Sequence, residues 1–229
     1  MTIRLFSTLA VRLALDEGVV DGFTRATGHA VETVYDPTNV LLERIAGGDL
    51  PDVMIGVRSQ LDGLAGDGVL AGPSLTDIAR VGVGIAAAPG AGPLPDLSTV
   101  DSLKAALLGA RSVAYSRTGA SGVYFASLLG QLGIAAAVNA RATVVEKGFT
   151  AQALLDGRAD LAVQQLSELR FVPEARLAGL LPDAVQHYTV FAAGVGARAR
   201  EREAAQGLVE HLAAPDAVGR YLAAGLEAV

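Results

Sequence analysis

Three short polar turns hold the residues of this sequence that are best suited to chemistry. Each turn follows a short apolar run typical of a buried strand and precedes a segment with helical spacing. The turn residues are Ser7 and Thr8 in the first, Thr38 and Asn39 after Asp36-Pro37 in the second, and Ser116, Arg117, Thr118, Gly119 and Ser121 in the third. In an open parallel sheet, such turns lie at the carboxyl ends of the strands, where ligands bind.

The position of these turns favours a small anion as the ligand. A helix N-terminus presents unpaired backbone N–H groups and the positive end of the helix dipole, and both attract negative charge. Ordinary helix capping by Ser, Thr, Asp or Asn explains any one of the turns equally well. The third turn, Thr118-Gly119-Ala120-Ser121-Gly122, has more small donors than one cap requires. It therefore favours the anion site.

Four basic residues lie next to predicted strands. Arg58, Arg117 and Lys147 come just after strands and are candidates for contacts to a carboxylate, whereas Arg80 is interpreted as a solvated surface cation. For Arg117 and Lys147, a surface position remains an open alternative.

The sequence lacks the motifs for dinucleotide binding, metal binding, nucleotide binding by a P-loop and hydrolysis by a nucleophile elbow. The run Gly82–Ala87 formally matches a dinucleotide fingerprint, but Pro89 and Gly90 prevent the helix that must follow it. The three histidines, His29, His187 and His211, lack metal-ligand spacing, and cysteine is absent. No P-loop or nucleophile elbow is present, and a Ser nucleophile would have His187 alone as its base. We expect no metal and no cofactor.

Composition limits the class of protein further. The chain has 229 residues, of which 51% are apolar and 18% charged, so it can bury a core without disulfides. The net charge of −6 argues against nucleic-acid binding, and no apolar run is long enough to span a membrane. No secretory signal pattern follows Met1, which predicts a cytoplasmic protein; a periplasmic or extracellular one is expected only if a signal has been removed.

Apolar segments alternate with helical patterns along the whole chain, which predicts an α/β fold. The expected strands are Ile3–Phe6, Val31–Val34, Asp52–Ile55, Val81–Ala88, Ser112–Tyr115, Thr143–Val145, Leu161–Gln164 and Tyr188–Gly194. The expected helices are Leu13–Thr27, Leu41–Ala46, Leu61–Ala65, Asp101–Leu108, Gly122–Gly133, Thr150–Leu155, Glu201–Ala213 and Asp216–Ala224. A Pro/Gly loop at 89–95 separates two cycles of strand and helix, which indicates two lobes.

The sequence resembles the type 2 periplasmic solute-binding proteins, in particular the molybdate-binding branch. The resemblance lies in the first strand with its Ser-Thr turn and in four further stretches: TGHAVE, GDLPDVMIGVRSQLDGLAGDGVL, GRADLAVQQLSEL and HLAAPDAVGRYLAAGL. The forms TGASG and AVQQLSEL look more like a side branch that includes aconitate isomerase, whose ligands are small polycarboxylates.

This resemblance implies two doubly wound lobes with parallel-rich sheets, joined by a two-strand hinge. Lobe 1 would comprise residues 1–82 and 190–229, and lobe 2 residues 83–189. The ligand would bind in a cleft between the lobes, held by the three polar turns and by the strand end at Gln164-Gln165. An ABC permease would be a partner if the protein is exported.

Two functions of different classes are consistent with these features. The first is binding of a small oxyanion or a di- or tricarboxylate, with closure about the hinge. The second is a cofactor-independent isomerase that shifts an allylic proton of an unsaturated polycarboxylate, in the manner of aconitate isomerase. Such an enzyme needs a base, for which Lys147, His187 or Glu146 are the candidates.

Overall fold

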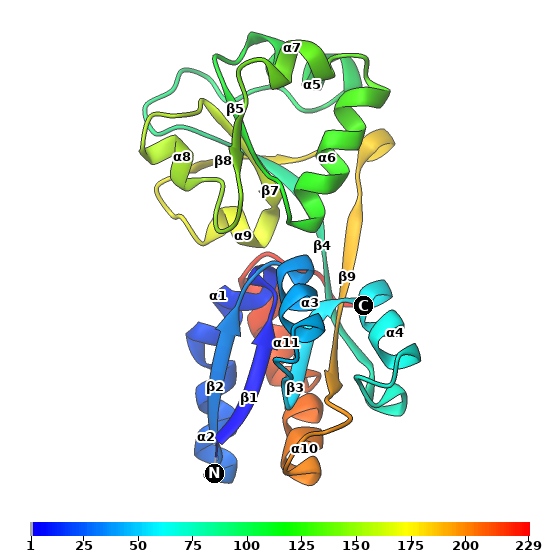
Figure 1. Ribbon diagram of the computed structural model, residues 1–229. Helices are drawn as coiled ribbons and strands as arrows, with labels where there is room; N and C mark the ends of the chain where they lie inside the picture. The colour runs from blue at the N-terminus through cyan, green and yellow to red at the C-terminus, as the bar shows by residue number, and fades with distance from the viewer. Residues whose placement is uncertain (1) are drawn as a thin grey trace. The chain divides into compact units, whose positions relative to one another are not determined.

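The computed structural model describes residues 2–229 and divides the chain into two compact units. Unit 1 comprises Met1–Arg80 and Thr189–Val229, and unit 2 comprises Val81–Tyr188. The chain passes between the units within β4 (Thr76–Ala87) and at the start of β9 (Tyr188–Val195). Both units combine helices with a mostly parallel sheet, so the predicted α/β class is confirmed (Figure 1).

The sheet of unit 1 has three parallel strands that end at one edge. Strand β1 (Thr2–Ser7) lies between β2 (Ala30–Tyr35) and β3 (Val53–Val57), and β9 pairs with β3 antiparallel. At the carboxyl end of β1, Ser7 lies opposite Tyr35 on one side and Ile55 on the other. The segments that follow these three strands therefore begin close together.

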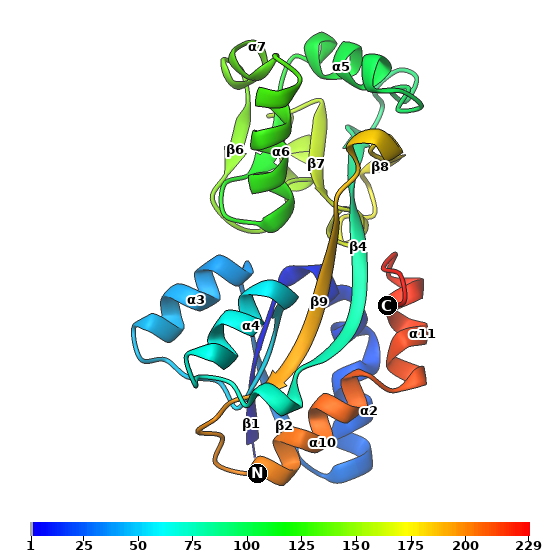
Figure 2. The same ribbon diagram turned by 90° about the vertical axis from the view of Figure 1, so that its right-hand side faces the viewer.

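Helices cover both faces of this sheet (Figure 2). Helices α3 (Thr38–Ala46) and α4 (Arg58–Gly66) lie on one side, and α2 (Val20–Thr27), α10 (Arg202–Leu212) and α11 (Pro215–Ala223) lie on the other. The core under α3 and α4 consists of Phe6, Leu41, Ile45, Met54, Leu61, Leu64, Leu70 and Ala192. This packing explains the helical spacing of the apolar residues in both segments.

The prediction of one continuous helix over Leu13–Thr27 is wrong. A short 3-10 turn, Leu9–Val11, leads into α1 (Arg12–Ala14), and a wider helical turn, Leu15–Val19, separates α1 from α2. Gly18 causes the break, because its φ of 122° lies outside the helical region and is strained for any residue with a Cβ. The predicted helix end at Thr27 is confirmed, because Gly28 adopts the left-handed conformation that ends a helix.

Unit 2 has a sheet in the order β4-β7-β5-β6, with β8 (Arg176–Leu180) also paired to β4. Strand β5 (Val113–Ser116) is parallel to both β6 (Thr143–Val145) and β7 (Leu161–Gln165). Because these three strands run the same way, the turns that follow them share one edge of the sheet. The sequence did not predict β8.

Two apolar layers cover the faces of the unit 2 sheet. Helices α5 (Val100–Gly109), α6 (Ala120–Gln131) and α7 (Ala135–Asn139) pack through Leu103, Leu107, Phe125, Leu128, Leu129 and Val138. Helices α8 (Gln152–Leu155) and α9 (Leu166–Arg170) pack through Ala153, Leu154 and Leu169 in a second cluster. The alternation of side chains along β5 and β7 separates the two clusters.

Helix α6 approaches β5 very closely through a glycine. A Cβ added to Gly122 would lie 1.8 Å from the carbonyl oxygen of Ser116. The backbone at Ser116 and at Gly122 cannot move apart without displacing the turn that joins them. Position 122 therefore excludes every residue that has a Cβ. Gly122 therefore fixes the start of α6 against the end of β5.

We expect Gly122→Ala to lower the free energy of unfolding by about 3 kcal/mol or more, because the added methyl group overlaps backbone atoms. Gly130→Ala is the matched control on the same helix, since a Cβ added there would meet nothing within 4 Å. That change should raise stability by up to about 1 kcal/mol through helix propensity. Urea unfolding of both variants measures the difference, and equal stabilities would contradict the close packing.

Candidate functional site

The first polar turn is buried and anchored to its neighbouring strand. Ser7 has no exposed surface, and its Oγ donates to the carbonyl oxygen of Thr8 at 3.1 Å. The backbone N–H of Thr8 donates to the carbonyl oxygen of Ile55 at 3.1 Å. These bonds hold both side chains at the carboxyl edge of the unit 1 sheet.

The second polar turn is tied to the segment that follows β3. Thr38 Oγ1 accepts a hydrogen bond from the Val57 N–H at 3.4 Å, and Asn39 Oδ1 accepts one from Gln60 Nε2 at 2.5 Å. Since Val57 ends β3 and Gln60 lies in the first turn of α4, the second turn and the β3–α4 junction form one connected group. The structure thus brings Thr38 and Asn39 to the same edge as Ser7 and Thr8.

Arg58 begins α4 at this edge but already has carboxylate partners. Its guanidinium contacts Asp62 at 2.9 Å and Asp77 at 2.7 Å. Hydrogen bonds to Asp77 and then to Asp62 raise the pKa of Arg58 above its ordinary value. A ligand would have to compete with these two ion pairs for Arg58. Arg80, interpreted as a surface cation, pairs with Glu227 at 2.9 Å within unit 1.

The third turn is linked to the segment that follows β6. The Arg117 N–H donates to the carbonyl oxygen of Val145 at 2.8 Å, and its Nε contacts Glu146 Oε1 at 2.7 Å. Thr118 Oγ1 donates to the carbonyl oxygen of Glu146 at 2.7 Å. Ser116 Oγ accepts from the Gly119 N–H at 2.9 Å, which leaves its own hydroxyl proton for another acceptor.

Ser121 belongs to the third turn and is the second residue of α6. Only 1% of its surface is exposed, and its hydroxyl has no hydrogen-bond partner within residues 2–229. The N–H groups of Ala120 and Ser121 belong to the first helical turn and so have no partner inside the helix. No side chain caps this helix. Several donors are therefore available at one point of unit 2.

The end of β7 completes this edge of unit 2. Gln164 Oε1 accepts from the Thr150 N–H at 2.7 Å and from Thr150 Oγ1 at 3.0 Å, and its Nε2 donates to the Gly148 carbonyl oxygen at 2.9 Å. Gln164 therefore holds the segment after β6 in place. Gln165, only 2% exposed, ends the strand beside it.

Two further residues of this edge were missed by the sequence analysis. Ser167 is 1% exposed, and its hydroxyl lacks a partner among the described residues. Glu168 is buried, and loss of hydration raises its pKa to about 8, although hydrogen bonds from the Gln165 backbone and the Gln164 side chain act in the opposite direction. The signal was present, since LSEL follows a strand as the three polar turns do.

The three candidate bases, Lys147, His187 and Glu146, lie in unit 2 and are exposed. Lys147 lies on the turn that follows β6. The His187 ring stacks on Tyr124, with 4.6 Å between ring centroids. Tyr124 lies one helical turn beyond Ser121, and its hydroxyl donates to the Val185 carbonyl oxygen at 2.8 Å. Burial raises the pKa of Tyr124. Catalytic roles for Lys147 and His187 stay predictions.

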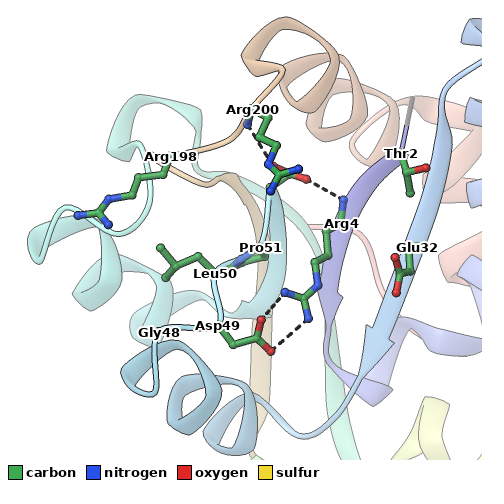
Figure 3. A pocket seen from close by; sticks show the side chains of 10 residues that line it. Thr2, Arg4, Glu32, Gly48, Asp49, Leu50, Pro51, Arg198 and Arg200 are labelled. Atoms are coloured by element: carbon green, nitrogen blue, oxygen red, sulfur yellow. Dashed lines mark hydrogen bonds and ion pairs between the residues drawn. The ribbon is translucent and has the colours of Figure 1, made fainter.

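A separate hollow of about 510 Å³ lies in unit 1, at the amino ends of β1 and β3 (Figure 3). It is lined by Thr2, Arg4, Glu32, Gly48, Asp49, Leu50, Pro51, Asp52, Arg198 and Arg200. Arg4 pairs with Asp49, and its backbone N–H donates to Asp52 Oδ2 at 2.9 Å. None of the predicted site residues lines this hollow.

Within residues 2–229, no group of three or more His, Asp or Glu side chains is arranged to hold a metal ion. The same part of the chain contains no helix that is long and apolar enough to cross a membrane.

The fold is that of the periplasmic binding proteins. The periplasmic molybdate-binding protein of Azotobacter vinelandii superposes with a TM-score of 0.81, covers 98% of each chain and is 20% identical. The sulfate-binding protein SubI from Mycobacterium tuberculosis superposes with a TM-score of 0.75 over 100% of this chain and 87% of that one, at 16% identity.

The chain belongs to the bacterial extracellular solute-binding protein family, whose model matches residues 3–227. An aconitate isomerase from a Pseudomonas species is 33% identical over 217 residues, which is 92% of this chain and 82% of that protein. The predicted resemblance to this family and to its aconitate isomerase branch is confirmed. Membership implies a small-molecule ligand.

The raised pKa of Glu168 makes stability depend on pH. The buried carboxyl keeps its proton up to about pH 8, whereas in the unfolded chain it loses it near 4.5. Between these values the folded state binds one more proton, so the free energy of unfolding should fall by about 1.4 kcal/mol per pH unit as pH rises.

Glu168→Gln should remove this pH dependence. The free energy of unfolding of the variant, relative to that of the natural protein, should therefore rise from pH 5 to pH 8 and then level off. Urea unfolding across this range measures it. Glu174→Gln, an exposed acid of the same unit, is the control and should show no such trend. A constant difference for Glu168→Gln would contradict the buried neutral carboxyl.

Proposed function

We propose that the protein binds a small di- or tricarboxylate through the polar turns at the carboxyl ends of its parallel strands. The observation that carries this proposal is the buried hydroxyl of Ser121, which lacks a partner among residues 2–229 and lies at the start of a 12-residue helix. In unit 2, the proposed ligand residues are Ser116, Arg117, Thr118, Gly119, Ser121, Gln164 and Gln165. In unit 1, they are Ser7, Thr8, Thr38, Asn39 and Arg58.

Local donors outweigh the negative charge of the protein. A charge about 15 Å from a ligand contributes only about 0.3 kcal/mol in water, and salt screens most of that. Each hydrogen bond to a charged ligand contributes about 1.5 to 3 kcal/mol. Four or five donors from the turns therefore decide the affinity, in spite of the net charge of −6.

The similarity to aconitate isomerase supports a carboxylate ligand rather than an inorganic oxyanion. The 33% identical relative is named for aconitate, a tricarboxylate, whereas the molybdate- and sulfate-binding proteins are similar in fold at 20% identity or less. If the protein is exported, we propose an ABC permease as its partner, as for a binding protein that delivers its ligand to a transporter.

We expect Ser121→Ala to weaken binding of trans-aconitate about tenfold or more, because it removes one hydrogen bond to a charged group. Isothermal calorimetry with cis- and trans-aconitate, citrate, molybdate, sulfate and phosphate measures the affinity of each anion. Ser127→Ala is the matched control, since Ser127 lies exposed on the same helix.

Equal affinities of the two serine variants would contradict the site. A protein that binds molybdate or sulfate and no carboxylate would contradict the proposed ligand class.

A second candidate function is isomerisation of an unsaturated polycarboxylate by an allylic proton shift. The observation that favours it is the length of the similarity to aconitate isomerase, which extends over 92% of this chain. The turns would then stabilise the negative charge that spreads over the substrate in the transition state.

We expect the protein to convert trans-aconitate into cis-aconitate and to introduce deuterium at carbon when the reaction runs in heavy water. Proton magnetic resonance follows both changes in one sample. A parallel sample without protein gives the uncatalysed rate. Binding without interconversion would leave the first function and exclude the second.

A further inference from the structure

Glu168 is a buried acid at the edge of unit 2 that carries the proposed ligand residues. It lies in α9, directly after the strand that ends with Gln164-Gln165, and only 8% of its surface is exposed. The adjacent strand β5 is parallel to β7, with Tyr115 opposite Val163. Glu168 and the third polar turn therefore follow neighbouring strands at the same edge.

The hydrogen-bond donors to the Glu168 carboxyl group are neutral. The Gln164 side chain and the Gln165 backbone N–H donate to it. The side-chain amide of Gln164 also accepts a hydrogen bond from the Thr150 N–H and donates one to the Gly148 carbonyl oxygen. The donors are thus fixed in place, and they are neutral amides that stabilise the carboxylate form of Glu168 without a cation.

The charged side chains on the elements around Glu168 either bond to other groups or are exposed to solvent. Strand β7 has no ionisable side chain. On β8, Arg176 donates to the backbone carbonyl of Gly92 at 2.9 Å. On the segment after β6, Glu146 pairs with Arg117, and Lys147 is exposed; on α9 itself, Arg170 is exposed. None of these contributes to the shifted pKa of Glu168, which arises from burial.

We propose that Glu168 is the acid–base residue that carries the proton between two carbons of a bound unsaturated polycarboxylate. This proposal rests on the isomerase function proposed above and names its catalytic group. A base that works near neutral pH is most effective when its pKa is close to the pH of the medium, and burial among neutral donors gives a carboxyl group that property.

The reaction needs no second reactant. The Glu168 carboxylate takes a proton from the methylene carbon of the substrate, and the electrons of the broken C–H bond form a double bond to the central carbon. The electrons of the original double bond move to the far carbon and its carboxylate. That carbon then takes the same proton from the Glu168 carboxylic acid, so the base is regenerated and no atom is gained or lost.

The buried position separates Glu168 from the bases that the sequence suggested. Lys147 and His187 are exposed, and His187 is stacked on Tyr124. Water competes with substrate for an exposed base and exchanges its proton between the two steps. A buried carboxyl exchanges its proton with water more slowly, so part of a deuterium label placed on the methylene carbon should reappear on the far carbon and the rest should be lost to water.

The test uses the full-length protein with trans-aconitate as the probe. We expect Glu168→Gln to lower the isomerisation rate by about 100-fold or more, with an affinity for trans-aconitate within threefold of the natural protein. The rate of the natural protein should rise with pH through about 8 as the carboxylate forms. Glu174→Gln should keep the natural rate, affinity and pH profile.

Each outcome bears on one proposal. An unchanged rate in Glu168→Gln, or a rate abolished in Lys147→Ala or His187→Gln but not in Glu168→Gln, overturns the role of Glu168. Binding without isomerisation by the natural protein also overturns it, while the binding function stands. Absence of binding by the natural protein overturns the proposed function itself. If Glu168→Gln does not fold, Glu168→Asp and the pH profile of the natural protein decide the matter.

Discussion

The chemistry of unit 2 depends on one close contact, between Gly122 and the backbone of Ser116. Ser116 ends β5, Gly122 lies in the first turn of α6, and no side chain fits between them. Their contact places the first turn of α6 directly against the end of β5, so that the N–H groups of the helix and the hydroxyl of Ser121 come together at a strand end.

At the same edge, some buried polar side chains have hydrogen-bond partners within the described chain and others have none. Gln164 uses both ends of its amide to hold the segment at Gly148–Thr150 in place. Ser121 and Ser167 keep buried hydroxyls without partners within the described chain, at a cost of about 1 to 3 kcal/mol each. A structure tolerates such a cost where a ligand supplies the missing acceptor.

Sequence reasoning predicted those parts of the fold that depend on local pattern. The helix start near Asp101 and the helix end at Thr27 were predicted, because the capping box of Thr99 and Ser102 and the left-handed Gly28 are formed by neighbouring residues. The break at Gly18 was not, since Gly inside an apolar helical pattern is usually tolerated. Strand β8 was missed because RLAGL pairs with β4 only after the chain has folded back. Roles for the polar turns came from their position along the chain. The segment LSEL has an equivalent position, but only the burial of Glu168 in the structure distinguishes this acid from the others.

Burial is what distinguishes a binding site from an acid–base site on this scaffold. Hydroxyls and N–H groups at helix starts hold a carboxylate without exchanging a proton with carbon, so they suffice for a binding protein. An isomerase needs in addition one group that changes protonation state near the working pH. In unit 2 the exposed acid Glu146 is paired with Arg117, whereas the buried acid Glu168 is held by amides that leave its proton removable. In the mechanism that we propose, a single carboxyl group withdrawn from water provides the chemical difference between holding a polycarboxylate and rearranging it.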